Sequence, residues 1–175
     1  MTNNAVDTTW PSEAEGFSFL NGHWRVHHRK LKALKTDCVE WIEFKGTAAF
    51  FTLLDGLVSV EELRDANGAP FGGAMRTFDR LRRVWLDAWV SASNGVLLTP
   101  VGGRFVDDVG EFIAQEIHEG KAMLVRGIWR RISSHQVTWE QAASLDEGKN
   151  WKTNWYMRFE RINEKTMSSE ALETQ

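Results

Sequence analysis

Residues 22–29 have the sequence Gly22-His23-Trp24-Arg25-Val26-His27-His28-Arg29, a short alternating run that opens with a glycine and a tryptophan. Successive side chains of a β-strand point to opposite faces. Trp24, Val26 and His28 therefore share one face, and Arg25 and His27 share the other. If Trp24 points inward, the run predicts a strand that places His28 in the interior.

The rest of the chain repeats this kind of pattern. Nine tryptophans occur in 175 residues, and most of them lie in short alternating runs typical of β-strands. The predicted strands are 23–32, 38–53, 57–64, 72–79, 83–91, 103–107, 111–118, 122–132, 136–144 and 152–161. Turn signals such as Asn67-Gly68 and Glu119-Gly120-Lys121 separate several of them. The sequence predicts an all-β fold, a closed antiparallel up-and-down β-barrel of about ten strands, because closure removes exposed sheet edges.

The length suits a single domain. We expect a flexible N-terminus over 1–11, a barrel domain over 12–162 and a flexible C-terminal tail over 163–175. Pro11 followed by Glu13 and Glu15 predicts a short helix within 12–21, since proline and carboxylates favour a helix N-terminus.

Several motifs together resemble one protein family. They are Phe17 to Arg29, Glu43-Phe44-Lys45-Gly46, Leu53-Leu54-Asp55-Gly56-Leu57, Arg76-Thr77-Phe78-Asp79, Trp139-Glu140-Gln141-Ala142 and Ser144 to Arg161. In this combination the chain resembles a large bacterial family of lipocalin-like proteins of the calycin superfamily, over roughly residues 16–162. The resemblance implies a small calycin-type barrel whose closed end is plugged by Trp24. It brings no catalytic residue set with it.

Composition excludes several functional classes. The net charge is −3 and the basic residues form no long run, so we expect no nucleic-acid partner. No apolar run approaches about 18 residues and no signal peptide is visible, so we expect no membrane contact. Cys38 is the only cysteine, so no intrachain disulfide can form. We expect a cytoplasmic protein in which Cys38 is a small buried side chain.

Ser144-Leu145-Asp146-Glu147-Gly148-Lys149-Asn150-Trp151 matches the Asp-box pattern known from sialidase-type propellers. We interpret it as a structural turn, in which the Asp146 carboxylate accepts hydrogen bonds, Gly148 takes a positive φ and Trp151 packs beneath. A sugar-binding role is the alternative.

Polar residues share strand faces with several tryptophans. Asp87 lies between Trp85 and Trp89 on one face, so it is either an outward residue at an interface or a buried carboxylate that needs a partner. Arg126 is the partner we expect, in an ion pair that is either structural or part of a pocket. The inward face of 83–91, 122–132 and 136–144 stays open at this point, so either Glu140 or the pair Trp139 and Gln141 is interior.

Trp155, Met157 and Phe159 form an apolar face typical of a core. His28 is either a core histidine hydrogen-bonded to a neighbouring strand or a ligand contact with acid–base capacity. No histidines and carboxylates have metal-ligand spacing, so we expect no metal and no other cofactor. The predicted ligand-binding residues are Trp24, His28, Trp85, Asp87, Trp89, Arg126, Trp139, Gln141, Trp155 and Met157.

The function we expect is binding of a small, mostly apolar, aromatic molecule in a Trp-lined cavity of the barrel, with an oxygen anion or hydroxyl held by Arg126. One alternative is a cofactor-independent enzyme, of lyase, isomerase or cyclase type, acting on an aromatic or polyketide-like substrate in the same cavity. Its candidate catalytic residues are His28, Asp87 and Glu140. A second alternative is a dimeric interaction module with a filled barrel.

Surplus aromatic residues predict a homodimer, with side chains such as Trp10, Phe50 and Phe51 at its interface. Sedimentation velocity over the micromolar range checks this prediction. A species of about 20 kDa throughout would contradict it, since the monomer has a mass of 20.0 kDa.

Overall fold

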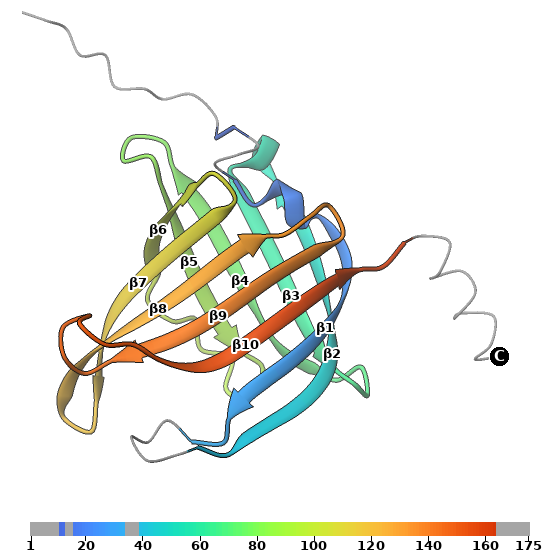
Figure 1. The fold of residues 1–175 in the computed structure, drawn as a ribbon. Helices are drawn as coiled ribbons and strands as arrows, with labels where there is room; N and C mark the ends of the chain where they lie inside the picture. The colour runs from blue at the N-terminus through green and yellow to red at the C-terminus, as the bar shows by residue number, and fades with distance from the viewer. Residues whose placement is uncertain (1–10, 13–15, 34–38, 164–175) are drawn as a thin grey trace, which may run out of the picture.

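The computed structural model describes residues 11–12, 16–33 and 39–163. Its ten antiparallel strands pair in chain order, and β10 returns to pair with β1, which closes the barrel (Figure 1). The strands are β1 (Gly22–Leu31), β2 (Trp41–Leu53), β3 (Val58–Asp65), β4 (Pro70–Asp79), β5 (Val84–Ser91), β6 (Val101–Val106), β7 (Val109–His118), β8 (Lys121–Arg131), β9 (Gln136–Ser144) and β10 (Lys152–Arg161). The closed all-β barrel predicted from the sequence is confirmed.

The region before β1 differs from the prediction. Instead of a helix over 12–21, the described residues form one turn of 3-10 helix, η1 (Ser18–Leu20). A second 3-10 turn, η2 (Leu54–Gly56), joins β2 to β3. Residues 13–15 of the predicted helix lie outside the described residues. None of the described helices is long and apolar enough to cross a membrane.

One end of the barrel is closed by the residues around Trp24. The Trp24 indole is fully buried and its Nε1 donates a hydrogen bond to the Leu20 carbonyl at 2.6 Å. The Arg161 guanidinium stacks on the indole at 4.1 Å. Arg161 also donates to the carbonyls of Phe19 and Asn21. Three elements distant in sequence, η1, β1 and β10, are thereby fastened together at this end.

The strand faces of β1 follow the predicted alternation. Trp24, Val26 and His28 are buried, whereas Arg25 is exposed. The same alternation on β10 buries Met157 and Phe159 in the barrel and turns Tyr156 outward. Period-two patterning therefore identified the interior side of both strands that close the barrel.

Some predictions fall on residues that the structure does not describe. Trp10, Cys38, most of 1–11 and nearly all of 163–175 lie outside the described residues. Of the two phenylalanines suggested for a dimer interface, Phe50 is buried inside the barrel and Phe51 is exposed. The homodimer stays a prediction.

Candidate functional site

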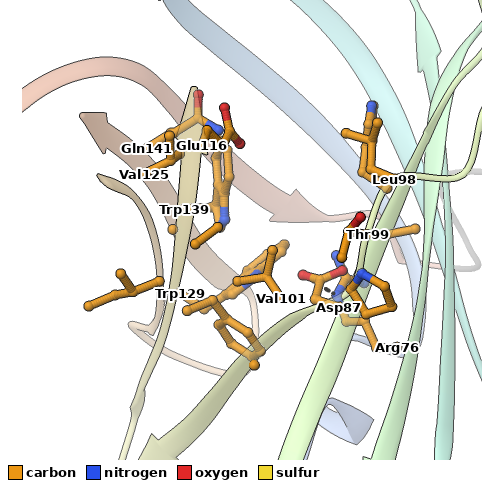
Figure 2. Close-up of a pocket in the computed structure, with 18 of the residues that line it drawn as sticks. Arg76, Asp87, Leu98, Thr99, Val101, Glu116, Val125, Trp129, Trp139 and Gln141 are labelled. Carbon is orange, nitrogen blue, oxygen red and sulfur yellow. Dashed lines mark hydrogen bonds and ion pairs between the residues drawn. The ribbon is translucent and has the colours of Figure 1, made fainter. Parts of the chain in front are cut away.

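A cavity of about 660 Å³ lies inside the barrel and reaches exposed residues at the end opposite η1. Figure 2 shows part of its lining, with the indoles of Trp129 and Trp139 on one side and the side chains of Arg76 and Asp87 on the other. Among its lining residues are Glu61, Ala74, Arg76, Asp87, Trp89, Leu98, Thr99, Val101, Ala114, Glu116, Val125, Gly127, Trp129, Trp139, Gln141, Trp155 and Met157. The barrel is therefore not filled by its own side chains.

An ion cluster of Arg76, Glu61 and Asp87 forms the inner end of the cavity. Arg76 Nη2 pairs with Glu61 Oε2, and Arg76 Nε donates to Asp87 Oδ2 at 3.1 Å. The three residues come from neighbouring strands β3, β4 and β5, and the register places Asp87 directly opposite Arg76 and Glu61 diagonally across from it. The Asp87 side chain is 21% exposed, whereas Arg76 and Glu61 are 3% and 2% exposed. Asp87 is the member most open to the cavity.

The Arg76 guanidinium packs against aromatic rings near the closed end of the barrel. Its Cζ atom lies 4.7 Å from the ring centre of Phe17 and 5.2 Å from that of Trp129. Phe17 directly precedes η1, at the closed end of the barrel. The ion cluster therefore packs against the residues that close this end. Such cation–π contacts stabilise a charge that has been removed from water.

Burial shapes the electrostatics of the cluster. It raises the pKa of Glu61 above the usual glutamate range, although the charge of Arg76 opposes the shift. The two neighbouring carboxylates raise the pKa of Arg76, against the effect of its burial. Arg76 is therefore held as a cation, while Glu61 protonates more readily than an exposed glutamate.

Indoles form the walls of the cavity. Trp139 and Trp155 meet edge to face, with ring centres 5.6 Å apart and planes at 87°. Trp89 lines the opposite part of the cavity. Its indole packs over Gly72, where a Cβ atom would overlap the ring. Flat apolar faces of this kind suit stacking with an aromatic guest.

His28 lies inside the barrel beside this cavity but is not among its lining residues. Its ring stacks on Phe44 with centres 4.3 Å apart and planes at 6°. Phe71 and Trp155 also lie about 5.9 Å away. Burial lowers the pKa of His28 to about 4, helped by the nearby charges of His27 and Lys30. The imidazole is therefore neutral at pH 7 and forms part of an aromatic cluster.

The predicted ligand-binding residues separate into three groups. Six of them line the cavity: Asp87, Trp89, Trp139, Gln141, Trp155 and Met157. Three are interior but do not line it, namely Trp24 at the closed end, Trp85 beside Phe17, and His28. Arg126 lies on the outer side of the barrel, because its neighbours Val125 and Gly127 face the cavity.

The predicted ion pair between Asp87 and Arg126 is wrong. Arg126 lies 3.7 Å from Glu111 and stacks over Trp151 at 4.3 Å. Arg76 takes its place beside Asp87. The apolar character of β8 is misleading here, because this strand carries apolar residues such as Leu124 and Ile128 on its outer face as well.

The predicted catalytic residues do not come together. Glu140 also lies on the outer side, where its carboxylate is 3.4 Å from Arg130. Its neighbours Trp139 and Gln141 face inward, which settles the face of β9. Asp87 is already engaged by Arg76, and His28 is not among the residues that line the cavity. In the described part of the chain, no group of three His, Cys, Asp or Glu side chains could hold a metal ion.

Sequence reasoning missed Arg76 and Glu61. Alternation on β4 places Arg76 with Ala74 and Phe78, and this signal could have identified it. The signal for Glu61 was misleading, because Val58 and Val60 point away from the interior while Glu61 points into it. A buried charge reverses the usual rule that the apolar face of a strand is the inner one.

The Asp-box residues form the predicted turn between β9 and β10. Asp146 accepts hydrogen bonds from the backbone and side chain of Asn150 and from the Ser144 hydroxyl. Gly148 has a φ of +86° and packs against Trp151. The Trp151 ring in turn lies under Arg126.

We expect Asp146→Ala to lower the free energy of unfolding at pH 7, with no change in ligand affinity. Hydrogen bonds from Asn150 and Ser144 lower the pKa of Asp146 to about 2, from an ordinary value of 3.8. A lowered pKa means that the stabilisation is present above pH 3.8 and is lost as the pH falls toward 2. Urea unfolding at pH 7 and at a pH close to 2 checks this prediction. Lys149→Ala, in the same turn, is the control. An equal loss at both pH values would contradict it.

The comparisons with known proteins extend only to the fold. No family model and no curated protein matches the chain. The chain is similar in structure to Rv2717c from M. tuberculosis, with 14% sequence identity and a TM-score of 0.53 over 83% of this chain and 94% of that chain. A redesigned β-barrel has the same identity and coverage with a TM-score of 0.44. The likeness to Rv2717c shows that both chains have a closed antiparallel β-barrel fold.

Proposed function

We propose that this protein binds a small, mostly apolar, aromatic molecule in the barrel cavity, as a lipocalin-like member of the calycin superfamily. The single observation that carries the proposal is an unfilled cavity of about 660 Å³ with indole walls and one polar end. Ligand sites in proteins combine these features: a concave apolar surface and a few fixed polar groups. A filled barrel would have favoured the interaction module instead.

The closed end supports the calycin assignment. Gly22 has a φ of +112°, so it permits the tight entry into β1 that the lipocalin-like pattern requires. Trp24 plugs that end, and Arg161 fastens it to η1. The ligand site is thereby confined to the other half of the barrel.

Isothermal titration calorimetry with naphthylmethanol tests the proposal. We expect saturable binding by the protein and much weaker binding of decanol, because only a flat ring can stack on the indoles. Ala114→Phe, which puts a ring into the cavity, should abolish binding. Ile117→Phe is the matched control on the same strand, since Ile117 is 73% exposed and lies outside the cavity.

The proposal requires both parts of this result. Absence of saturable heat in the unmodified protein would contradict it. So would naphthylmethanol binding that Ala114→Phe leaves unchanged, since the binding would then lie outside the barrel. Circular dichroism of both variants checks that each retains the β-barrel.

A further inference from the structure

The charged residues that line the cavity are predominantly acidic. Among the lining residues, Glu61, Asp87 and Glu116 are carboxylates, and Arg76 is the single cation. Glu116 is exposed near the mouth, and Asp87 is reached at the inner end. A guest would therefore meet carboxylates at both ends of its path, which favours a positively charged molecule.

Arg76 offers little to an anion in the cavity. Its Nε and Nη2 atoms hold Asp87 and Glu61, and its Nη1 atom, which has no hydrogen-bond partner among the described residues, is buried in a side chain that is 3% exposed. With both carboxylates ionised, the ion cluster carries one negative charge. If Glu61 takes up a proton, the cluster becomes neutral. In neither state does the inner end of the cavity present the excess positive charge that an anionic ligand needs.

Asp87 is the group that a ligand can reach. It is the most exposed of the three charged side chains, and Arg76 engages it through its Oδ2 atom. An ionised carboxylate keeps further acceptor capacity after one hydrogen bond. The indole of Trp89, which lines the same cavity, supplies a negative ring face that also attracts cations.

We propose that the ligand is an aromatic molecule bearing a protonated amine, whose ammonium group binds Asp87 while its ring stacks among the tryptophans. This inference rests on the proposed function, since it names the class of molecule that the same cavity takes. The ammonium group neutralises the surplus carboxylate of the ion cluster, and the aromatic body fills the apolar part. The oxygen anion or hydroxyl expected from the sequence is replaced by a cationic group, because Arg126 lies on the outer side of the barrel.

Calorimetry with three matched compounds tests the inference: naphthylmethylamine, naphthylmethanol and naphthoate at pH 7. They share one ring system and differ in the charge of a one-carbon polar group. We expect the amine to bind about tenfold or more tighter than the alcohol, since a charge-assisted hydrogen bond contributes about twice a neutral one. We expect naphthoate to bind weakest of the three.

Asp87→Asn identifies the contact. The variant keeps an acceptor for Arg76 and leaves Arg76 and Glu61 as a balanced pair, so the fold should persist. We expect it to lose most of the preference for the amine while its affinity for the alcohol changes by less than about threefold. Glu116→Gln is the control for general attraction at the mouth, and it should retain the preference.

The outcomes separate this inference from the proposed function. If the alcohol binds in a manner that Ala114→Phe abolishes, but the amine gains nothing over it, the inference fails and the proposed function stands. The inference also fails if Asp87→Asn keeps the full preference for the amine. If none of the three naphthalenes binds, both fail together.

Discussion

Replacing Arg76 with methionine is expected to destabilise the protein by about 3–5 kcal/mol at pH 7, because the change leaves buried carboxylates without their cation. Glu61 is almost fully buried, and Asp87 is only partly open to the cavity. Urea unfolding measures the loss. Arg64→Met is the matched control, because Arg64 pairs with Glu62 on the exposed face of the neighbouring strand. A surface pair of that kind is worth about 1 kcal/mol or less.

The loss should also depend on pH. Burial already raises the pKa of Glu61, and removal of Arg76 takes away the charge that opposes the shift. A group whose pKa is raised in the folded state favours folding at low pH and loses that contribution as the pH rises. The defect of Arg76→Met should therefore be smaller at pH 5 than at pH 8. A loss no larger than that of Arg64→Met, or one that is constant with pH, would contradict the buried ion cluster.

Trp24→Ala is expected to cost about 3–5 kcal/mol, as a large-to-small change in a close-packed core. The variant loses the fully buried indole, its hydrogen bond to Leu20 and the surface on which Arg161 stacks. Urea denaturation measures the change. Trp41→Ala is the control, since Trp41 packs against Tyr156 and Arg29 on the outside of the barrel. We expect about 1 kcal/mol or less there.

A cost for Trp24→Ala below about 1 kcal/mol would contradict the assignment of Trp24 to the plug. The destabilisation by Trp24→Phe should lie between those of Trp24→Ala and Trp41→Ala, since the variant keeps a buried ring but loses the donor to the Leu20 carbonyl. Trp24→Ala and Trp24→Phe leave every residue that lines the cavity unchanged, because Trp24 is not one of them. Naphthylmethanol binding by the folded fraction should therefore be preserved.

Alternation was sufficient to predict the fold, and β1 shows why. Each strand has a period of two, so one anchored residue such as Trp24 assigns a face to all the others. The same logic placed Met157 and Phe159 inside the barrel, as found. Closure followed from the number of strands and the short turns between them, because an open sheet of that size would leave unpaired edges.

The polar end of the site was less predictable, because partnership across strands depends on register. Asp87 was predicted to be either an outward residue or a buried carboxylate that needs a partner, and the ion pair with Arg76 shows that the second alternative is correct. The cation is Arg76, directly opposite on β4, whereas Arg126 lies three strands further along the sheet and on the other face. A single sequence contains no record of which strand residues stand opposite each other, and the composition of a strand does not reveal its register.

The residue types predicted a Trp-lined cavity, but they could not exclude the alternative of a filled barrel. The same aromatic residues could have filled the barrel, as they do around Phe17, Trp85 and Trp129 at the closed end. Small residues such as Ala74, Ala114 and Gly127 leave the other half open between the indoles. Small side chains in strands carry no signal that separates a cavity from close packing.

Methyl NMR of protein labelled at its methionine methyl groups tests binding inside the barrel most directly. Met157 lines the cavity, whereas Met75 is 45% exposed and lies outside it. On titration with naphthylmethylamine, we predict a saturable shift of the Met157 methyl signal and nuclear Overhauser contacts from that methyl to the naphthalene protons. The Met75 signal should stay in place. Movement of Met75 with an unchanged Met157 would contradict the account, because the ligand would then bind the outer surface.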